Sequence, residues 1–242
     1  LCALLSLPYP CLAQEVVILG NDYKIPKIFV EEGEPKGILI DIAKTIDQRM
    51  DDWEFSYHLY PWARAYKNAL GSDGGIIGLS MTSERLEIFD YSEPIFYDEV
   101  IIVVQRGKEF PYETIQDLHG KRVGIGRGGS FGDEFDNAVN SGLFTVVEDN
   151  GPVARLNILL VGRIDCALIS PGLTALKHVI SQDTFLLEHQ DELAALPVSF
   201  KRDPNYLGFA KSMDMQSFLA AFNAALAVLK ESGELERIIG RY

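Results

Sequence analysis

The fold is decided by a stretch that begins as a buried strand and ends in polar residues: Ile76-Ile77-Gly78-Leu79-Ser80-Met81-Thr82-Ser83-Glu84-Arg85. Its first half predicts a strand, and its second half places hydroxyl groups and a guanidinium directly after that strand. In open α/β sheets, ligands bind at the carboxyl ends of the strands. A planar guanidinium can hold a carboxylate through two parallel hydrogen bonds. The stretch is equally compatible with a surface turn in which Arg85 pairs with Glu87 or Asp90.

The composition is that of an acidic globular protein. The chain has 242 residues, with 22 Lys and Arg against 35 Asp and Glu and a net charge of −13. This length suits one large domain or two lobes of about 100–120 residues. The negative charge argues against nucleic acid and anionic membranes as partners. It does not exclude an anionic small ligand, because one buried arginine can dominate a local site.

Residues 1–14 differ from the rest, since they carry no charge and end near a small residue, Ala13. They predict the remnant of a secretory signal peptide cut after Ala13, with Cys2 and Cys11 removed. No other stretch approaches the about 20 apolar residues that a membrane helix needs. Cys166 then remains alone, so no intramolecular disulfide is expected. Its apolar surroundings predict a small buried side chain.

The flanking segments alternate between strand and helix patterns, which is typical of a parallel α/β sheet. The predicted strands around the opening stretch are 16–19, 28–30, 37–40 and 53–60, with Asp41 capping a helix and Pro61 opening another. A long β-branched strand, 99–105, precedes a second α/β unit. The strand 206–211 and a helix over 218–230 close the chain. We expect lobe 1 to comprise 15–102 and 206–242, and lobe 2 to comprise 103–205.

In this order and spacing, the motifs resemble the extracytoplasmic solute-binding protein family 3, the polar amino-acid binding proteins of ABC importers. The resemblance covers nearly all of the chain after residue 14. It is carried by the motifs Gly37–Ala43, Gly78–Arg85, Phe89–Pro94, Leu118–Gly124, Gly162–Asp165 and Ser232–Tyr242. It implies an α/β, two-lobe periplasmic-binding-protein (Venus flytrap) fold with two crossing hinge strands, near Val100–Gln105 and Val198–Tyr206. It also implies ligand binding in the cleft between the lobes.

The resemblance assigns candidate ligand-binding residues one position at a time. Tyr23 and Trp62 match aromatic residues that pack on the ligand. Ser80 and Arg85, with Thr82 between them, match the part of lobe 1 that holds a carboxylate. Gly129 and Ser130 match a turn in lobe 2 that donates hydrogen bonds to the same carboxylate.

The chain departs from the family pattern at Ser170. Amino-acid binders usually carry an aspartate there, which holds the ammonium group of the ligand. A neutral hydroxyl cannot offset a buried ammonium, whose desolvation costs several kcal/mol. Either another acid, Glu93 or Asp98, takes this role, or the ligand has no α-ammonium.

Other signals point away from cofactors and metals. The turn Gly126–Ser130 lacks the lysine of a nucleotide phosphate loop, and it predicts an anion-binding helix N-terminus. Within it, Arg127 is either a second cation in the cleft or a solvated turn residue, and the second alternative is favoured. The four histidines, His58, His119, His178 and His189, are scattered, so no metal site is expected. Trp62 and Arg64 are two residues apart, so only one of them, Trp62, is expected to face the cleft.

These observations favour a monomeric periplasmic protein that delivers a small carboxylate-bearing solute to an ABC permease, with no enzymatic activity. One rival interpretation is a cyclohexadienyl-dehydratase-like enzyme on the same fold, for which Glu93 would be the first candidate acid or base. Another is a sensory protein that presents its ligand to a receptor.

Overall fold

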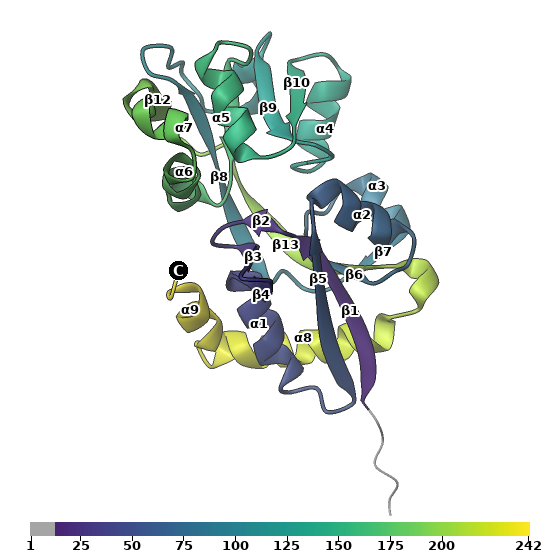
Figure 1. Ribbon diagram of the computed structural model, residues 1–242. Helices are drawn as coiled ribbons and strands as arrows, with labels where there is room; N and C mark the ends of the chain where they lie inside the picture. Colours follow the sequence, from purple (N-terminus) through teal and green to yellow (C-terminus); the bar gives the residue numbers. More distant parts are fainter. Residues whose placement is uncertain (1–12) are drawn as a thin grey trace, which may run out of the picture.

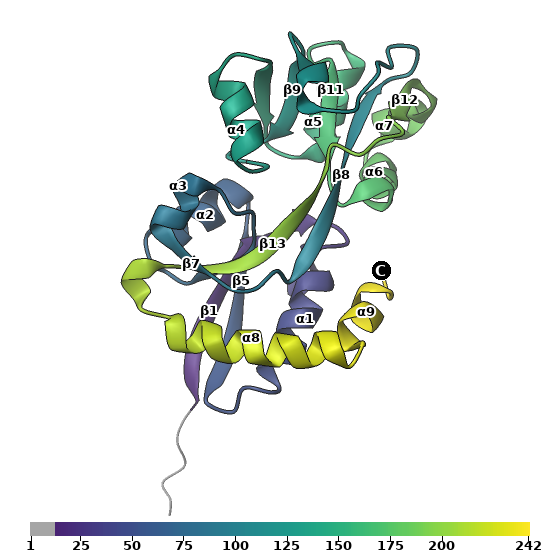
Figure 2. The same ribbon diagram turned by 180° about the vertical axis from the view of Figure 1, so that it is seen from behind.

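The computed structural model describes residues 13–242 as two α/β lobes joined by two long strands (Figure 1). The joining strands are β8 (Phe96–Gln105) and β13 (Lys201–Ala210), which both views show running from one lobe into the other (Figure 2). They pair antiparallel over residues 96–100 and 201–205. The two-lobe architecture with crossing strands is therefore as the sequence predicts. The lobe limits expected after residues 102 and 205 fall within these strands. A signal peptide is expected at 1–14, and its residues 1–12 lie outside the described residues. Gln14, at its end, is already the first residue of β1.

Lobe 1 has a sheet in the order β13-β6-β1-β5, with β7 also paired to β13 and a small sheet of β2, β3 and β4 beside it. Strands β1 and β5, and β1 and β6, are parallel. The elements of this lobe are β1 (Gln14–Asn21), β2 (Tyr23–Lys24), β3 (Ile28–Glu31), β4 (Glu34–Lys36), α1 (Ile38–Asp47), β5 (Trp53–Tyr60), α2 (Trp62–Leu70), β6 (Gly75–Leu79), α3 (Ser83–Ile88), β7 (Phe89–Tyr91), α8 (Gln216–Glu231) and α9 (Glu234–Ile239).

Lobe 2 has a sheet in the order β10-β9-β11-β8, with β12 also paired to β8. Strands β9, β10 and β11 are parallel, and β8 is antiparallel to β11. Its elements are a 3-10 helix (Ile115–Leu118), β9 (Arg122–Gly126), α4 (Asp133–Asn140), β10 (Thr145–Asp149), α5 (Pro152–Leu160), β11 (Cys166–Ile169), α6 (Gly172–Ser181), α7 (Thr184–Glu188) and β12 (Leu193–Ala195), with a further 3-10 turn at 190–192. A third 3-10 turn, at 211–213, follows β13 in lobe 1.

The continuous apolar runs in the strands arise because helices cover both faces of each sheet. In β6, Ile77 faces the cluster formed with α1 and α8, whereas Ile76 faces the cluster formed with α2. In β8, Ile102 and Ile101 alternate in the same way between two clusters of lobe 2. Successive side chains of a strand point to opposite faces, so both must be apolar when both faces are buried.

One strand prediction is wrong. Residues 37–40 do not form a strand, because α1 begins at Ile38 and Gly37 is its N-cap with φ 112°. Asp41 therefore lies in the first turn rather than at the cap. Ile38, Leu39, Ile40 and Ile42 are all buried, and a helix buried on nearly every side carries the same short apolar run as a buried strand. The short helix α3 was also not predicted, since six residues give too little periodicity.

The sheet of lobe 1 leaves no room for a side chain at Gly75. A Cβ there would lie within 3.0 Å of three ring carbons of Phe209, which is 1% exposed. Gly75→Ala should therefore lower the free energy of unfolding by about 1–3 kcal/mol, the usual cost of overpacking a core. Urea denaturation measures the change. The exposed helix-end variant Gly71→Ala, with φ −79°, serves as the control and should change it by less than about 0.5 kcal/mol. Equal stabilities of the two variants would contradict this packing.

Candidate functional site

A cavity of about 640 Å³ lies between the two lobes and is lined by residues of both. The carboxyl ends of five strands reach it: Asn21 ends β1, Ser80 follows β6, Gly126 ends β9, Asp149 ends β10 and Ser170 follows β11. This is where ligands bind in open parallel sheets. Two facing sheets contribute here, so the cavity can enclose a small molecule from both sides.

The cavity brings together most of the residues that the sequence singled out. Its lining includes Tyr23, Trp62, Ser80, Arg85, Gly129, Ser130 and Ser170. Thr82 is not among the lining residues. Its hydroxyl accepts the backbone N–H of Arg85 at 3.1 Å and caps α3, so Thr82 positions the helix that carries the arginine. Glu93 is exposed and also lies outside the lining.

Arg85 is a buried cation without a carboxylate partner. Its side chain is 5% exposed, and Nη1 donates to the carbonyl oxygen of Ser80 at 3.0 Å. The guanidinium lies 5.0 Å from the centre of the Tyr66 ring. Within residues 13–242 it forms no ion pair, so the alternative in which it pairs with Glu87 or Asp90 is wrong. A buried guanidinium with unused donors is suited to an anion.

Ser80 is fixed by the crossing strand β13. Its hydroxyl donates to Asp203, whose other oxygen lies 2.9 Å from the Lys201 ammonium. The hydroxyl proton is thereby used within the protein, which leaves the oxygen as an acceptor. This contact ties the end of β6 to one of the two strands that join the lobes.

The turn before α4 supplies the lobe 2 side of the cavity. The Gly129 N–H donates to the Gly126 carbonyl at 2.9 Å, and the Ser130 hydroxyl donates to Asp136 at 2.8 Å. Burial raises the pKa of Asp136, against the Ser130 hydrogen bond and the charge of Arg85. The backbone N–H groups of Arg127, Gly128 and Gly129 are used within the protein. The Ser130 N–H has no acceptor in the described part of the chain, so this turn can offer it to a ligand.

Three pairs of residues form hydrogen bonds between the lobes near the cavity. Trp62 Nε1 donates to the Gly128 carbonyl at 3.3 Å, and Lys24 Nζ donates to Ser170 Oγ at 2.9 Å. The Ser83 N–H and hydroxyl donate to Asp133 at 2.7 and 2.6 Å. These bonds hold the pKa of Asp133 below its ordinary value. The lobes are therefore in contact on both sides of the cavity.

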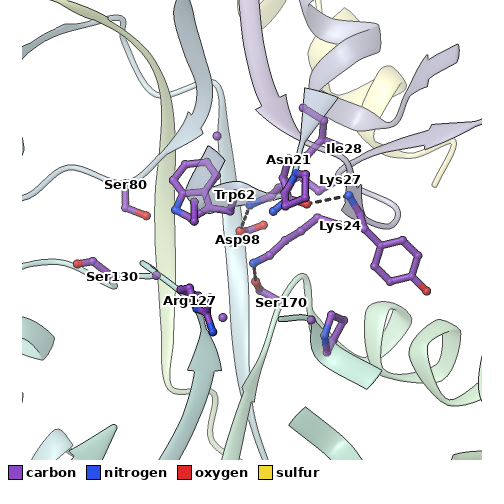
Figure 3. Close-up of a pocket in the computed structure, with 18 of the residues that line it drawn as sticks. Asn21, Lys24, Lys27, Ile28, Trp62, Ser80, Asp98, Arg127, Ser130 and Ser170 are labelled. Carbon is purple, nitrogen blue, oxygen red and sulfur yellow. Dashed lines mark hydrogen bonds and ion pairs between the residues drawn. The ribbon is translucent and has the colours of Figure 1, made fainter. Parts of the chain in front are cut away.

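The segment 24–27 contributes charges that the sequence interpretation passed over as part of a loop. Lys27 is 5% exposed and donates to Asp98 on β8 (Figure 3). It also donates to Asn205 on β13. Asp98 is 3% exposed, and its Oδ1 has no hydrogen-bond partner among residues 13–242. Lys24 and Lys27 lie within a few residues of the end of the first strand. Their place at the ligand-binding edge of the sheet could therefore have been predicted from the sequence. The partners of Lys27 lie 71 and 178 residues away along the chain, which the sequence does not show.

A second buried ion pair forms the cavity wall in lobe 2. Arg155 of α5 donates through Nε and Nη2 to the two oxygens of Asp149, at 2.7 and 2.9 Å. Its Nη1 donates to the Leu168 carbonyl at 2.6 Å. Asp149 and Arg155 satisfy each other, so neither is left to bind a charged ligand.

Two exposed arginines also line the cavity. Arg127 is both an exposed turn residue and a lining residue, so the two alternatives for it are compatible. Arg64 was expected to face away from the cleft, and that prediction is wrong. Both contribute to the lining because the first turn of α2 and the turn after β9 stand at its rim. Arg64 also stacks on Tyr60, with 4.3 Å between the guanidinium carbon and the ring centre.

The described residues show no cluster that would hold a metal ion. Cys166 is fully buried, and burial raises the pKa of its thiol to about 12. Its interpretation as a small buried side chain is confirmed. Between residues 13 and 242, no helix has the length and apolar character of a membrane span.

Comparison with known proteins identifies a family and several relatives to which this chain is similar. The family described as bacterial extracellular solute-binding proteins, family 3, matches residues 16–242. The L-cystine-binding protein TcyJ of Escherichia coli (strain K12) is 29% identical over 160 residues, which cover 66% of this chain and 56% of that protein. ABC transporter arginine-binding protein 1 of the same strain is 27% identical over 207 residues, or 84% of this chain and 79% of that protein.

A solved structure has the same fold. A histidine kinase sensor domain with similarity to periplasmic binding proteins superposes with a TM-score of 0.77 at 19% identity, covering 95% of this chain and 96% of its own. The two-lobe periplasmic-binding-protein fold that the sequence predicts is thereby confirmed. The match to TcyJ spans little more than half of the length of that protein.

Proposed function

Because this chain belongs to the bacterial extracellular solute-binding proteins, family 3, we propose that it is the periplasmic binding component of an ABC importer. Its solute is a small molecule that bears a carboxylate. The observation that carries this proposal is Arg85, a buried guanidinium that faces the interlobe cavity without an ion-pair partner in the described chain. The curated relatives above are named as binding proteins for cystine and arginine, which supports a binding role.

Binding proceeds in two steps. The carboxylate of the solute first docks on the Arg85 guanidinium in lobe 1, where Thr82 holds α3 in place. Lobe 2 then closes and brings the Ser130 N–H to the same carboxylate. The motion bends β8 and β13, the two strands that join the lobes. Tyr23 and Trp62 enclose the solute and exclude water, which strengthens each polar contact.

The net charge of −13 leaves the outer surface unsuited to nucleic acid. We propose that the monomeric protein presents its closed form to the membrane permease in the periplasm. The permease can then distinguish the ligand-bound protein from the ligand-free protein by its closed shape. The contacts Trp62–Gly128 and Ser83–Asp133 form only when the lobes meet.

The rival enzyme interpretation loses its first candidate acid, because Glu93 is exposed and outside the cavity lining. It is tested by incubating the protein with prephenate or arogenate and following the aromatic product by absorbance. We expect no turnover above the rate without protein. Sustained turnover would overturn the binding-protein proposal.

The proposal is tested by a thermal-shift screen of the twenty amino acids, small mono- and dicarboxylates and polyamines. A ligand at 100 times its dissociation constant stabilises the folded state by about 2.7 kcal/mol. For a chain of this size that corresponds to a rise in Tm of about 5–11 °C. We expect such a rise with at least one carboxylate and none with polyamines. A screen in which only polyamines stabilise the protein would contradict a carboxylate site.

A further inference from the structure

Lys24 contributes a positive charge to the cavity lining. Its side chain extends from β2 in lobe 1 toward Ser170 in lobe 2, and Nζ donates to Ser170 Oγ at 2.9 Å (Figure 3). In the described chain it has no carboxylate within ion-pair distance. The charged groups around it are Lys27, Asp98, Arg155 and Asp203. Two of these, Asp98 and Asp203, are already paired with other lysines.

The surroundings of Lys24 are short of negative charge. Burial lowers its pKa to about 7, and the charges of Lys27 and Arg155 act in the same direction, against Asp98 and Asp203. A ligand ammonium beside Ser170 would add a further cation next to Lys24 and would be repelled. A carboxylate in the same place would accept hydrogen bonds from both Lys24 Nζ and Ser170 Oγ.

The cavity as a whole has an excess of positive charge, in contrast to the acidic chain. Six lining side chains are cationic and four are carboxylates: Lys24, Lys27, Arg64, Arg85, Arg127 and Arg155 against Asp22, Asp98, Asp149 and Asp203. Lys27 and Arg155 are neutralised by their partners. Four cations remain, of which Arg64 and Arg127 are exposed to solvent. Arg85 and Lys24 are the two less exposed ones, so one carboxylate cannot satisfy the site.

We propose that the solute carries two carboxylates, one bound by Arg85 and the second bound between Lys24 Nζ and Ser170 Oγ. This inference rests on the proposed function, because it takes the first carboxylate to be the one on Arg85. Asp98 Oδ1, buried and without a partner in residues 13–242, accepts a donor from the middle of the solute. The presence or absence of that donor distinguishes the two classes of solute that carry two carboxylates. An acidic amino acid offers its ammonium to Asp98, and a dicarboxylic acid without nitrogen offers none.

Binding of the second carboxylate should be accompanied by uptake of a proton at Lys24. The free lysine, with a pKa of about 7, is mostly neutral at pH 8.5, and the carboxylate favours the charged form. Affinity should therefore be highest below pH 7 and fall by up to about tenfold per pH unit above it. The carboxylates of the solute stay ionised throughout this range. A ligand cation placed beside Lys24 would instead disfavour the charged lysine, so that binding would release a proton.

The experiment is calorimetric titration of the full chain at pH 6 and pH 8.5, each in two buffers of different ionisation enthalpy. The probes are succinate, glutarate, adipate, L-aspartate and L-glutamate, with L-glutamine and L-arginine as single-carboxylate controls. We expect one of the five dicarboxylates to bind at least about tenfold more tightly than either control, with proton uptake at pH 8.5 only. A preference for the acidic amino acids over the dicarboxylic acids, or the reverse, identifies the source.

The matched variants are Lys24→Met and Lys36→Met. The Lys36 side chain is 43% exposed, pairs with Glu31 and lies outside the cavity. Lys24→Met should weaken the dicarboxylate by about tenfold or more and abolish proton uptake, whereas Lys36→Met should change neither. Dicarboxylate affinity within twofold of the unmodified chain in Lys24→Met, or proton release on binding, would overturn the inference.

Different experimental results would overturn the proposed function and the two-carboxylate inference. If L-glutamine, L-arginine or another single carboxylate binds best and Arg85→Ala removes that binding, the two-carboxylate inference is overturned and the proposed function remains. If no probe binds and no carboxylate stabilises the protein in the thermal-shift screen, both are overturned.

Discussion

Arg85→Ala should remove most of the affinity for the compound that stabilises the protein best in the thermal-shift screen. The guanidinium is buried at the cavity, and its loss leaves the ligand carboxylate in a dry site without its principal donor. Truncating one member of a buried charged pair costs about 2–5 kcal/mol, which weakens binding from about thirtyfold to more than a thousandfold. Calorimetric titration at neutral pH measures the change.

Two further variants separate charge from geometry at this position. Arg85→Lys keeps the charge but cannot form two parallel hydrogen bonds, so its affinity should lie between those of Arg85→Ala and the unmodified chain. The control is Arg49→Ala, since Arg49 pairs with Glu234 outside the cavity. Arg85→Ala strands no buried carboxylate but removes the donor to the Ser80 carbonyl. It should therefore lower the stability of the ligand-free protein by less than the about 3–5 kcal/mol that breaking a buried ion pair costs. Binding within a few-fold of the unmodified chain would show that the carboxylate is held elsewhere.

Arg155→Met should have the largest effect on stability. The substitution leaves Asp149, which is 8% exposed, buried without its cation and also removes the donor to the Leu168 carbonyl. Breaking a buried ion pair in this way costs about 3–5 kcal/mol. Urea denaturation followed by circular dichroism should show the midpoint shifted to lower urea concentration, with little change in slope.

The chain provides a matched control in the ion pair of Arg122 and Asp165. It has similar two-pronged geometry, at 2.8 and 3.1 Å, but its side chains are 45% and 38% exposed. Arg122→Met should therefore cost only about 0–1 kcal/mol. Equal destabilisation by the two variants would mean that burial does not set the strength of the Arg155 pair.

The sequence predicts those parts of the fold that depend on local pattern. The strand 53–60 is confirmed with the same limits, and the strand that ends before Ser80 and the final amphipathic helix are confirmed to within a few residues. Local pattern fails at 37–40, where a helix buried on nearly all sides looks like a strand. It also fails to place the start of β13 at Lys201, because Pro204 is tolerated there within the crossing strand.

The residues of the candidate site also divide into those that local sequence predicts and those that depend on tertiary structure. Ser80 and Arg85 are close in sequence and follow one strand, so their shared position at the cavity could be predicted. Lys24 and Ser170 are 146 residues apart, and the hydrogen bond between them depends on how the two lobes meet. Sequence comparison could identify Ser170 as a departure from the amino-acid-binding pattern, but not the lysine that faces it. The orientation of that lysine is a consequence of tertiary structure.

The most direct test is a crystal structure of the complex with the compound that gives the largest thermal shift. The central claim predicts that the compound lies in the cavity between the lobes, with a carboxylate within hydrogen-bonding distance of the Arg85 guanidinium. Electron density for the compound outside this cavity, or a cationic or uncharged group of the compound facing Arg85, would contradict it.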